Sequence, residues 1–130
     1  MKINLRDIER FEKQIILKKI GISGQKRIFN SKILIIGMGG LGCPLLTYLA
    51  ASGVGNIGIV DYDKVELSNL SRQTLFSSND LGKYKVDKAK KKIAVLNKKI
   101  KVTKFKEKIN FQNIKSIIKN FDIICDGTDD

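Results

Sequence analysis

Four glycines and one aspartate form the part of this sequence best suited to chemistry. The stretch GMGGLG contains Gly37, Gly39, Gly40 and Gly42. Without Cβ atoms, the main chain of such a turn can approach a phosphate group closely, and the amides of a following helix point toward it. Asp61 follows at about the 20-residue spacing of a carboxylate that binds ribose hydroxyls. These residues predict a nucleotide site.

The residues around the glycines predict the elements that hold them. Ile33 to Ile36 is an apolar run without alternation, typical of a strand buried on both faces of a parallel sheet. A leucine-rich helical face follows, and Gly53 and Gly55 end that helix. Asn56 to Val60 is a second strand, so Asp61 closes a βαβ unit. The pattern leaves open whether NAD, FAD or ATP is the ligand.

The rest of the chain is typical of one α/β domain. We expect a Rossmann-like, mainly parallel sheet with flanking helices over 31–130, preceded by a helical arm over 1–30. In the arm, Leu5 to Lys19 reads as one amphipathic helix and Gln25 to Phe29 as a second, separated by Gly21 and Gly24. The later predicted elements are a helix Lys83 to Leu96, a strand Ile100 to Phe105, a helix Phe111 to Ile118 and a strand Phe121 to Cys125.

Two polar segments follow strands of this predicted sheet. The segment after Asp61 supplies Asp63, Ser68, Asn69, Arg72 and Gln73. The last residues of the chain add Asp129 and Asp130. Ligands of open α/β sheets bind at the carboxyl ends of the strands, so we expect both segments to line the nucleotide crevice.

Composition excludes several classes of protein. Hydrophobic content of 42% and charged content of 29% are typical of soluble globular domains. No apolar run is long enough for a bilayer and the N-terminus has no apolar signal core, so we expect a cytoplasmic protein without membrane contact. The net charge of +12 comes mostly from lysines spread along the chain. Because aromatic residues are not interleaved with them, we expect no nucleic-acid partner.

The cysteines give little sign of metal or thiol chemistry. Cys43 and Cys125 stand far apart, and the chain has no histidine. A zinc site or a Cys-His pair therefore cannot be built from this chain alone. Cys43 falls in the first helical turn after the glycines, where the helix dipole could acidify a thiol, but a packing role is the interpretation we favour.

Several separated motifs together resemble a known family. They are RFEKQIIL at Arg10, GISGQ at Gly21, GMGGLG at Gly37, DYDKVELSNLSRQ at Asp61, GKYK at Gly82 and CDGTDD at Cys125. In this order they resemble the N-terminal half of the adenylation domain of the ThiF/MoeB/HesA type, within the superfamily of ubiquitin-activating enzymes. Domains of that type continue for roughly another hundred residues. We therefore expect an incomplete domain whose sheet has one edge awaiting further strands.

The resemblance implies a reaction and its participants. The expected reaction is ATP-dependent adenylation of the C-terminal glycine carboxylate of a ubiquitin-like sulfur-carrier protein that ends in Gly-Gly, for molybdopterin or thiamine synthesis. ATP and Mg²⁺ are the implied cofactors, a homodimer is the implied assembly, and the zinc site of the family would lie beyond this chain. The attacking carboxylate is already ionised at neutral pH, so no general base is needed, in agreement with the absence of histidine.

The resemblance also implies roles for individual residues. Arg72, Lys85, Lys13 and Asp129 would be catalytic, with Asp129 also binding Mg²⁺. Lys13 stands where the family commonly has an arginine that reaches the neighbouring subunit's ATP site, and Asp130 stands where asparagine is favoured. The residues implied around the nucleotide are Gly37, Gly39, Gly40, Gly42, Asp61, Asp63, Ser68, Asn69, Arg72, Gln73, Lys85, Asp129 and Asp130.

Two alternative functions remain open. An NAD-linked oxidoreductase could use the same βαβ unit, although it leaves the SNLSRQ loop unexplained. A non-catalytic partner subunit is the other alternative, because part of the family's adenylation domain is not present in these 130 residues.

Overall fold

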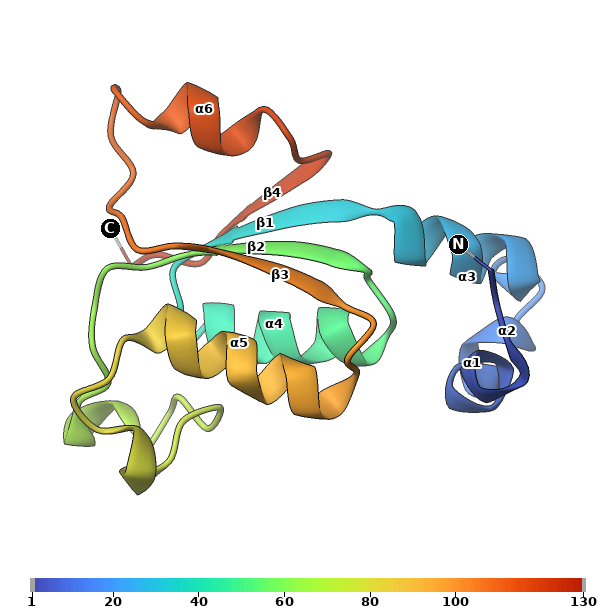
Figure 1. Cartoon of the computed structure of the whole chain (residues 1–130), viewed down its shortest axis with the longest axis horizontal. Helices are drawn as coiled ribbons and strands as arrows, with labels where there is room; N and C mark the ends of the chain where they lie inside the picture. The colour runs from blue at the N-terminus through green and yellow to red at the C-terminus, as the bar shows by residue number, and fades with distance from the viewer. Residues whose placement is uncertain (1, 130) are drawn as a thin grey trace.

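Four parallel strands form a single sheet in the computed structural model, which describes residues 2–129 (Figure 1). The strands are β1 (Lys32–Ile36), β2 (Asn56–Val60), β3 (Lys101–Phe105) and β4 (Ile123–Asp126). Their order is β3-β2-β1-β4, with all three neighbouring pairs parallel. The direction of winding reverses between β1 and β4, and such a reversal opens a ligand crevice at the carboxyl ends of the strands. The predicted Rossmann-like sheet is confirmed.

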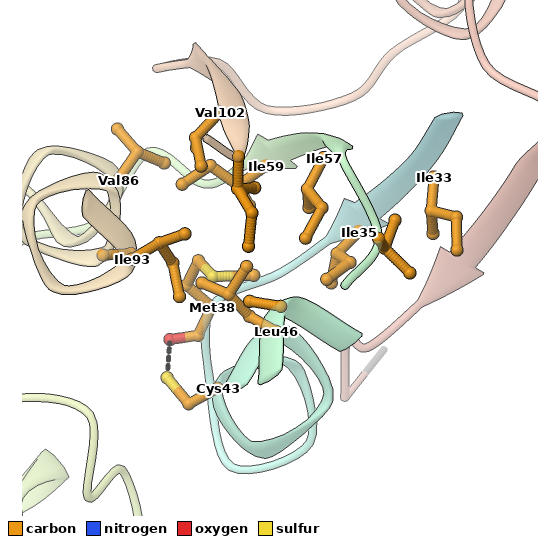
Figure 2. Packing of buried hydrophobic residues seen from close by; sticks show 14 of the residues in the cluster. Ile33, Ile35, Met38, Cys43, Leu46, Ile57, Ile59, Val86, Ile93 and Val102 are labelled. Carbon is orange, nitrogen blue, oxygen red and sulfur yellow. Dashed lines mark hydrogen bonds between the residues drawn. The ribbon is translucent and has the colours of Figure 1, made fainter. Parts of the chain in front are cut away.

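Helices cover both faces of the sheet. The helices α4 (Gly42–Ala51) and α5 (Lys85–Leu96) lie on one face, and α6 (Ile114–Ile118) lies on the other (Figure 1). Apolar side chains of both helices pack against isoleucines of β1 and β2 to form the main core (Figure 2). The rigid core under α4 and α5 therefore supports the glycine turn that connects β1 to α4.

The apolar run of β1 is buried on both of its faces. Ile33 and Ile35 belong to the main core, while Leu34 packs on the opposite face with Val60 and Ile117. Each fully buried side chain of this size contributes about 1.5–3 kcal/mol relative to the exposed state. The absence of alternation in the sequence thus predicted the position of β1 correctly, since a central parallel strand has no solvent face.

The helical arm is present, but its elements differ from those predicted. It consists of α1 (Leu5–Arg10), α2 (Glu12–Ile15) and α3 (Gly21–Asn30). The single helix expected from Leu5 to Lys19 is wrong, because the chain bends at Phe11, which is 3% exposed while Ile16 is 71% exposed. The expected break at Gly24 is also wrong, since α3 continues through it.

Two glutamines fix the arm to the end of α4. The amide groups of Gln14 and Gln25 each donate from Nε2 to the carbonyl oxygen of Ser52, at 2.9 Å in both cases. Gln14 also donates to Oε1 of Gln25 at 2.8 Å. Phe11 packs against Gly53, where an added Cβ would lie 2.9 Å from the phenyl ring. The arm is therefore held at the end of the sheet opposite to the carboxyl ends of the strands (Figure 1).

The segment between β2 and α5 is folded rather than structureless. It contains two short 3-10 helices, η1 (Leu67–Asn69) and η2 (Ser78–Asp80), and Lys64 and Tyr84 form an antiparallel bridge across its base. Val65 and Phe76 anchor it in the main core. This packing holds the polar side chains of the segment beside the end of β2.

The strands β3 and β4 form the two edges of the sheet. β4 pairs with β1 alone, and Ile123 and Ile124 are exposed. The helix expected from Phe111 begins instead at Ile114, and Phe111 is fully exposed. Among residues 2–129, no helix has the length and hydropathy needed to cross a membrane.

Candidate nucleotide-binding site

A cavity of about 520 Å³ opens at the carboxyl ends of the strands. Its walls come from the turn after β1, the segment after β2, the first residue of α5, the loop between β3 and α6, and the end of β4. The structure brings together the following residues of the predicted site: Gly37, Gly39, Asp61, Asp63, Asn69, Arg72, Gln73, Lys85 and Asp129. Segments far apart in the sequence therefore meet at one place, as the sheet topology requires.

Other predicted site residues lie outside the cavity wall. Gly40 and Ser68 are exposed beside Arg72, and Gly42 is buried behind the turn. Lys13 is exposed on the arm, where its ammonium group lies 3.4 Å from the Glu12 carboxylate. Asp130 lies outside the described residues. Within a single copy of the chain, Lys13 does not reach this cavity.

The glycines of the turn serve two different purposes. Gly37 has a φ of 95°, a left-handed conformation that favours glycine. A Cβ on Gly42 would overlap the carbonyl group of Gly37, so this glycine lets the start of α4 pack on the turn. A Cβ on Gly39 or Gly40 would meet no protein atom closer than 3.8 Å. The fold therefore requires Gly37 and Gly42, whereas Gly39 and Gly40 leave the main chain accessible.

Asp61 joins the glycine turn to the next segment. Its Oδ2 accepts a hydrogen bond from the amide of Met38 at 2.7 Å, and its Oδ1 accepts one from the amide of Asp63 at 2.7 Å. Each carboxylate oxygen can accept a further bond, so a ligand hydroxyl can still bind. Asp61 therefore holds the turn in place and is also a candidate acceptor for ribose hydroxyls.

Lys85 is the most unusual charge in the site. Its side chain is 5% exposed and lines the cavity, and its main-chain amide donates to the carbonyl of Asp63 at 3.0 Å. None of the ion pairs among residues 2–129 includes Lys85. A buried ammonium group is costly unless an anion accompanies it. This position therefore favours an anionic ligand.

Arg72 and Asn69 provide further donors. The Arg72 Nη1 donates to the carbonyl of Ser68 at 3.1 Å, and its aliphatic stem packs near Gly40. Asn69 accepts from the amide of Glu66 at 2.8 Å through Oδ1, which caps η1. The Asn69 amide nitrogen is the donor left for a ligand. Both residues therefore line the cavity, and their roles toward a ligand stay predictions.

The loop after β3 forms a wall of the cavity that was not predicted from the sequence. Glu107, Lys108, Ile109 and Ile114 line the cavity, and the Lys108 ammonium lies 5.7 Å from the centre of the Tyr62 ring. The sheet topology could have indicated this loop, because the carboxyl ends of all the parallel strands lie at the same edge of the sheet. The polar residues of this loop belong to none of the motifs that carry the family resemblance, so they gave no local reason to include it.

Asp126 was also absent from the predicted site. Its Oδ1 accepts from the amide of Thr128 at 3.0 Å and from the Thr128 hydroxyl at 2.6 Å. These hydrogen bonds lower the pKa of the Asp126 carboxyl group below its usual value. Asp126 thus stays ionised and holds the turn that presents Asp129 to the cavity.

Asp129 fits Mg²⁺ only together with a phosphate ligand. Among residues 2–129, no cluster of three or more acidic, cysteine or histidine side chains could hold a metal by itself. Mg²⁺ commonly binds through one or two carboxylates together with the phosphates of a substrate. The donor set of the cavity, whose lining includes Asp129, Lys85 and Arg72, suits that arrangement.

Cys43 is a packing residue in this structure. Its thiol is buried and donates to the carbonyl of Met38 at 3.3 Å (Figure 2). Burial raises the pKa of Cys43 to about 12, although the nearby Lys85 acts in the opposite direction. A thiol that keeps its proton at neutral pH is a poor nucleophile. The interpretation favoured from the sequence is therefore supported.

The sheet order, the glycine turn and the polar cavity define the Rossmann-like class of α/β proteins. Within that class, residues 11–130 match the model of the ThiF family. The match extends over nearly the whole chain, and the protein belongs to the ThiF family.

Named relatives agree with this membership. A probable molybdopterin-synthase adenylyltransferase of Porphyra purpurea is 48% identical over 126 residues, which are 97% of this chain and 33% of the relative. The adenylyltransferase and sulfurtransferase MOCS3 of Culex quinquefasciatus is 44% identical over 98% of this chain and 29% of its own length. The chain thus spans about a third of the curated relatives that it matches.

A solved structure of a similar protein shows the same fold. E. coli MccB, solved with AMPCPP and MccA, superposes with a TM-score of 0.69 at 35% sequence identity. The superposition covers 72% of this chain and 27% of MccB.

Proposed function

We propose that this chain is the nucleotide-binding part of an ATP-dependent adenylyltransferase. The substrate would be the C-terminal glycine carboxylate of a ubiquitin-like sulfur-carrier protein that ends in Gly-Gly. Membership of the ThiF family and the adenylyltransferase names of its relatives support this proposal. MccB, which is 35% identical, was solved with the adenine nucleotide AMPCPP. Molybdopterin synthesis is the proposed pathway, with thiamine synthesis as the alternative.

The observation that carries the proposal is the convergence of cations and bare main chain on one cavity. Lys85 is buried without an anionic partner among the described residues, and Arg72 lines the same wall. Gly39 brings unobstructed main chain to that wall. A triphosphate compensates both charges and fits against the turn, because phosphate binds to exposed amides and cationic side chains together.

The proposed reaction forms one oxygen–phosphorus bond and breaks another. A carboxylate oxygen of the carrier attacks the α-phosphorus of ATP, and pyrophosphate leaves with the electron pair of the broken bond. Arg72 and Lys85 stabilise the negative charge that grows on the phosphoryl oxygens, and Asp61 orients the ribose. Mg²⁺, when bound at Asp129, supplies further positive charge to the phosphates.

We propose a homodimer in which Lys13 acts on the neighbouring copy. Lys13 lies on the arm, at the opposite end of the sheet from the cavity, and its side chain is exposed (Figure 1). It could therefore reach a nucleotide only in a second subunit. Compared with arginine, lysine keeps the charge but loses the bidentate fork, so we expect a weaker contact with the triphosphate. A cytoplasmic location is proposed because the reaction consumes ATP.

The direct test is ATP:pyrophosphate exchange in the presence of a carrier protein that ends in Gly-Gly. Lys85→Ala and Arg72→Ala should each reduce exchange by about 10²-fold or more, since each removes positive charge directed at the transition state. Lys92→Ala, on the exposed side of the same helix α5, is the matched control and should leave exchange unchanged. Exchange that survives both cavity substitutions would refute the assigned roles.

Two further measurements separate the alternative functions. Tighter binding of NAD than of ATP would favour an oxidoreductase. Absence of exchange, together with formation of a stable complex with a catalytic ThiF-type subunit, would favour a non-catalytic partner. For action across the dimer, Lys13→Ala subunits mixed with Asp129→Ala subunits should recover part of the activity, and no recovery would exclude that role of Lys13.

A further inference from the structure

A second cavity lies at the end of the sheet opposite to the nucleotide site (Figure 1). Its volume is about 390 Å³, and its walls come from α1 and from the end of α5 with the residues that follow it. Among the described residues, its lining includes one carboxylate, that of Asp7, and four cationic side chains, those of Arg6, Arg10, Lys98 and Lys99. The proposed adenylation uses none of these residues.

The negative charge of Asp7 is already compensated inside the protein. Its Oδ2 accepts from Nζ of Lys99 at 2.7 Å and from the amide of Asn4 at 3.0 Å. Burial by itself raises the pKa of Asp7, but these hydrogen bonds outweigh it and lower the pKa below its usual value. Asp7 is therefore ionised and paired with Lys99, and the other cations of the cavity are left without an anion.

Arg10 is held in place before any ligand arrives. Its Nη1 donates to the carbonyl of Leu96 at 3.0 Å and so caps the end of α5. A guanidinium group has five N–H donors, so further donors of Arg10 are available to a ligand. A side chain that is already ordered loses less conformational entropy on binding. Capping explains the position of Arg10 and at the same time prepares it for an anion.

Neither capping nor pairing explains Arg6 and Lys98. Neither side chain forms an ion pair or a hydrogen bond with another residue of 2–129. The lysine-rich composition does not explain them either, because only four of the 25 basic residues are arginine and two of those four line this cavity. Arginine binds carboxylates through two parallel hydrogen bonds, which lysine cannot do.

The same cavity has an apolar wall. Ala94, Val95 and Leu96 line it, and Val95 is 88% exposed. A small inorganic anion would leave this wall in contact with water. A ligand that combines carboxylates with an aliphatic side chain would cover it and compensate the cations together, as the central anchor and polar rim of a protein interface do.

We propose that this cavity is a docking site for an acidic segment of a partner protein. An aliphatic side chain of the segment packs on Val95, and its flanking carboxylates bind Arg6, Arg10 and Lys98. The proposal goes beyond the proposed function and does not depend on it, because the site is separate from the nucleotide cavity. A partner can therefore dock at the arm while a nucleotide occupies the other end of the sheet.

Fluorescence anisotropy with the labelled peptide Ser-Asp-Glu-Leu-Glu-Asp-Ser tests this proposal in the protein as its gene encodes it. The double variant Arg6→Gln with Lys98→Gln should bind the peptide about five- to tenfold more weakly, since it removes two charge-assisted contacts. Lys115→Gln with Lys119→Gln is the matched control, because it removes the same charge from exposed positions at α6. The control should weaken binding by less than about twofold, since distant surface charges are screened.

The apolar contact has its own test. Val95→Gln keeps every charge and changes an exposed side chain, so it should fold normally and weaken peptide binding by about three- to fivefold. A peptide with glutamine in place of leucine should bind the wild type and Val95→Gln equally, because the two changes remove the same contact. This arm decides the question even if the charge variants alter folding.

Several results would overturn the proposal. They are no measurable binding of the peptide, an equal loss of affinity in both double variants, and unchanged affinity in Val95→Gln. Displacement of the peptide by ATP would place it in the nucleotide cavity and would also overturn the proposal. Pyrophosphate or an oligouridylate that binds more tightly than the peptide, and loses affinity in Arg6→Gln with Lys98→Gln, would assign the site to a small anion or to RNA instead.

Discussion

Substitution of Gly42 by alanine separates the two reasons for glycine in the turn. Gly42 is the first residue of α4, where helix propensity by itself predicts that alanine stabilises by about 1 kcal/mol. In the structure, however, a Cβ at this position would overlap the carbonyl oxygen of Gly37 and lie 2.8 Å from its carbonyl carbon. The two arguments predict opposite signs for the change in stability.

The magnitude follows from how little the neighbouring atoms can move. The obstacle is main chain rather than a flexible side chain, and Gly37 is fixed at a φ of 95° and hydrogen-bonded from its amide to the carbonyl of Val60 at 2.7 Å. Accommodation requires the turn and α4 to separate by roughly 1 Å, and overpacking of this kind typically costs about 1–3 kcal/mol, occasionally more. We expect a net loss of about 3 kcal/mol, or about 10 °C in melting temperature for a domain of this size.

Thermal unfolding and ATP titration of Gly42→Ala and Gly40→Ala test the argument. Gly40 has room for a Cβ, whose nearest neighbour would be Arg72 at 3.8 Å. Gly40→Ala should therefore keep the wild-type melting temperature within a few degrees, while ATP binding weakens if main chain must approach a phosphate there. A stabilised Gly42→Ala protein, or one that melts like Gly40→Ala, would refute the reasoning.

Two further predictions concern the arm and the buried thiol. Gly53→Ala should lower stability by about 2–3 kcal/mol and expose the arm to proteolysis before the sheet, because a Cβ would lie 2.6 Å from the Gln25 amide at a φ of 98°; cleavage at the wild-type rate would contradict this. Cys43 should stay unreactive toward a thiol reagent at about pH 8 in the native protein, since burial raises its pKa to about 12. In the unfolded protein the Cys43 thiol loses its proton as the pH rises above its ordinary pKa of 9.0, whereas the native thiol keeps its proton. The contribution of Cys43 to stability should therefore fall as the pH rises toward 12. Cys43→Ala should lack that component of the pH dependence.

Much of the central sheet could be predicted because local sequence signals agree with one another there. The unbroken apolar run of β1, the glycine turn and the spacing to Asp61 depend on neighbours within about 30 residues, the size of a βαβ unit. The structure places Asp61 on the turn, with the Met38 amide as its partner. The segment after β2 and the end of β4 could be assigned to the crevice because parallel strands end at one edge.

The arm was less predictable because its helix boundaries depend on tertiary contacts. The spacing from Leu5 to Ile16 fits one amphipathic helix, but Phe11 packs against Gly53, which lies far away in the sequence. Burial of that one ring bends the chain and leaves Ile16 exposed. Helical periodicity describes which residues could share a face, and it does not state which face finds a partner.

The sequence by itself determined the family, the parallel sheet and the identity of most charged groups around the cavity. Only the tertiary structure showed that Lys85 is buried without an anion among the described residues, and that Gly42 lets α4 pack on the glycine turn. It also showed that Gln73 has a side-chain oxygen without a hydrogen-bond partner, whereas the oxygen of Gln25 has one. The physical reason is that residue type fixes what a group can donate or accept. Whether a partner is present depends on side chains brought together from distant segments, and a linear pattern does not record those distances.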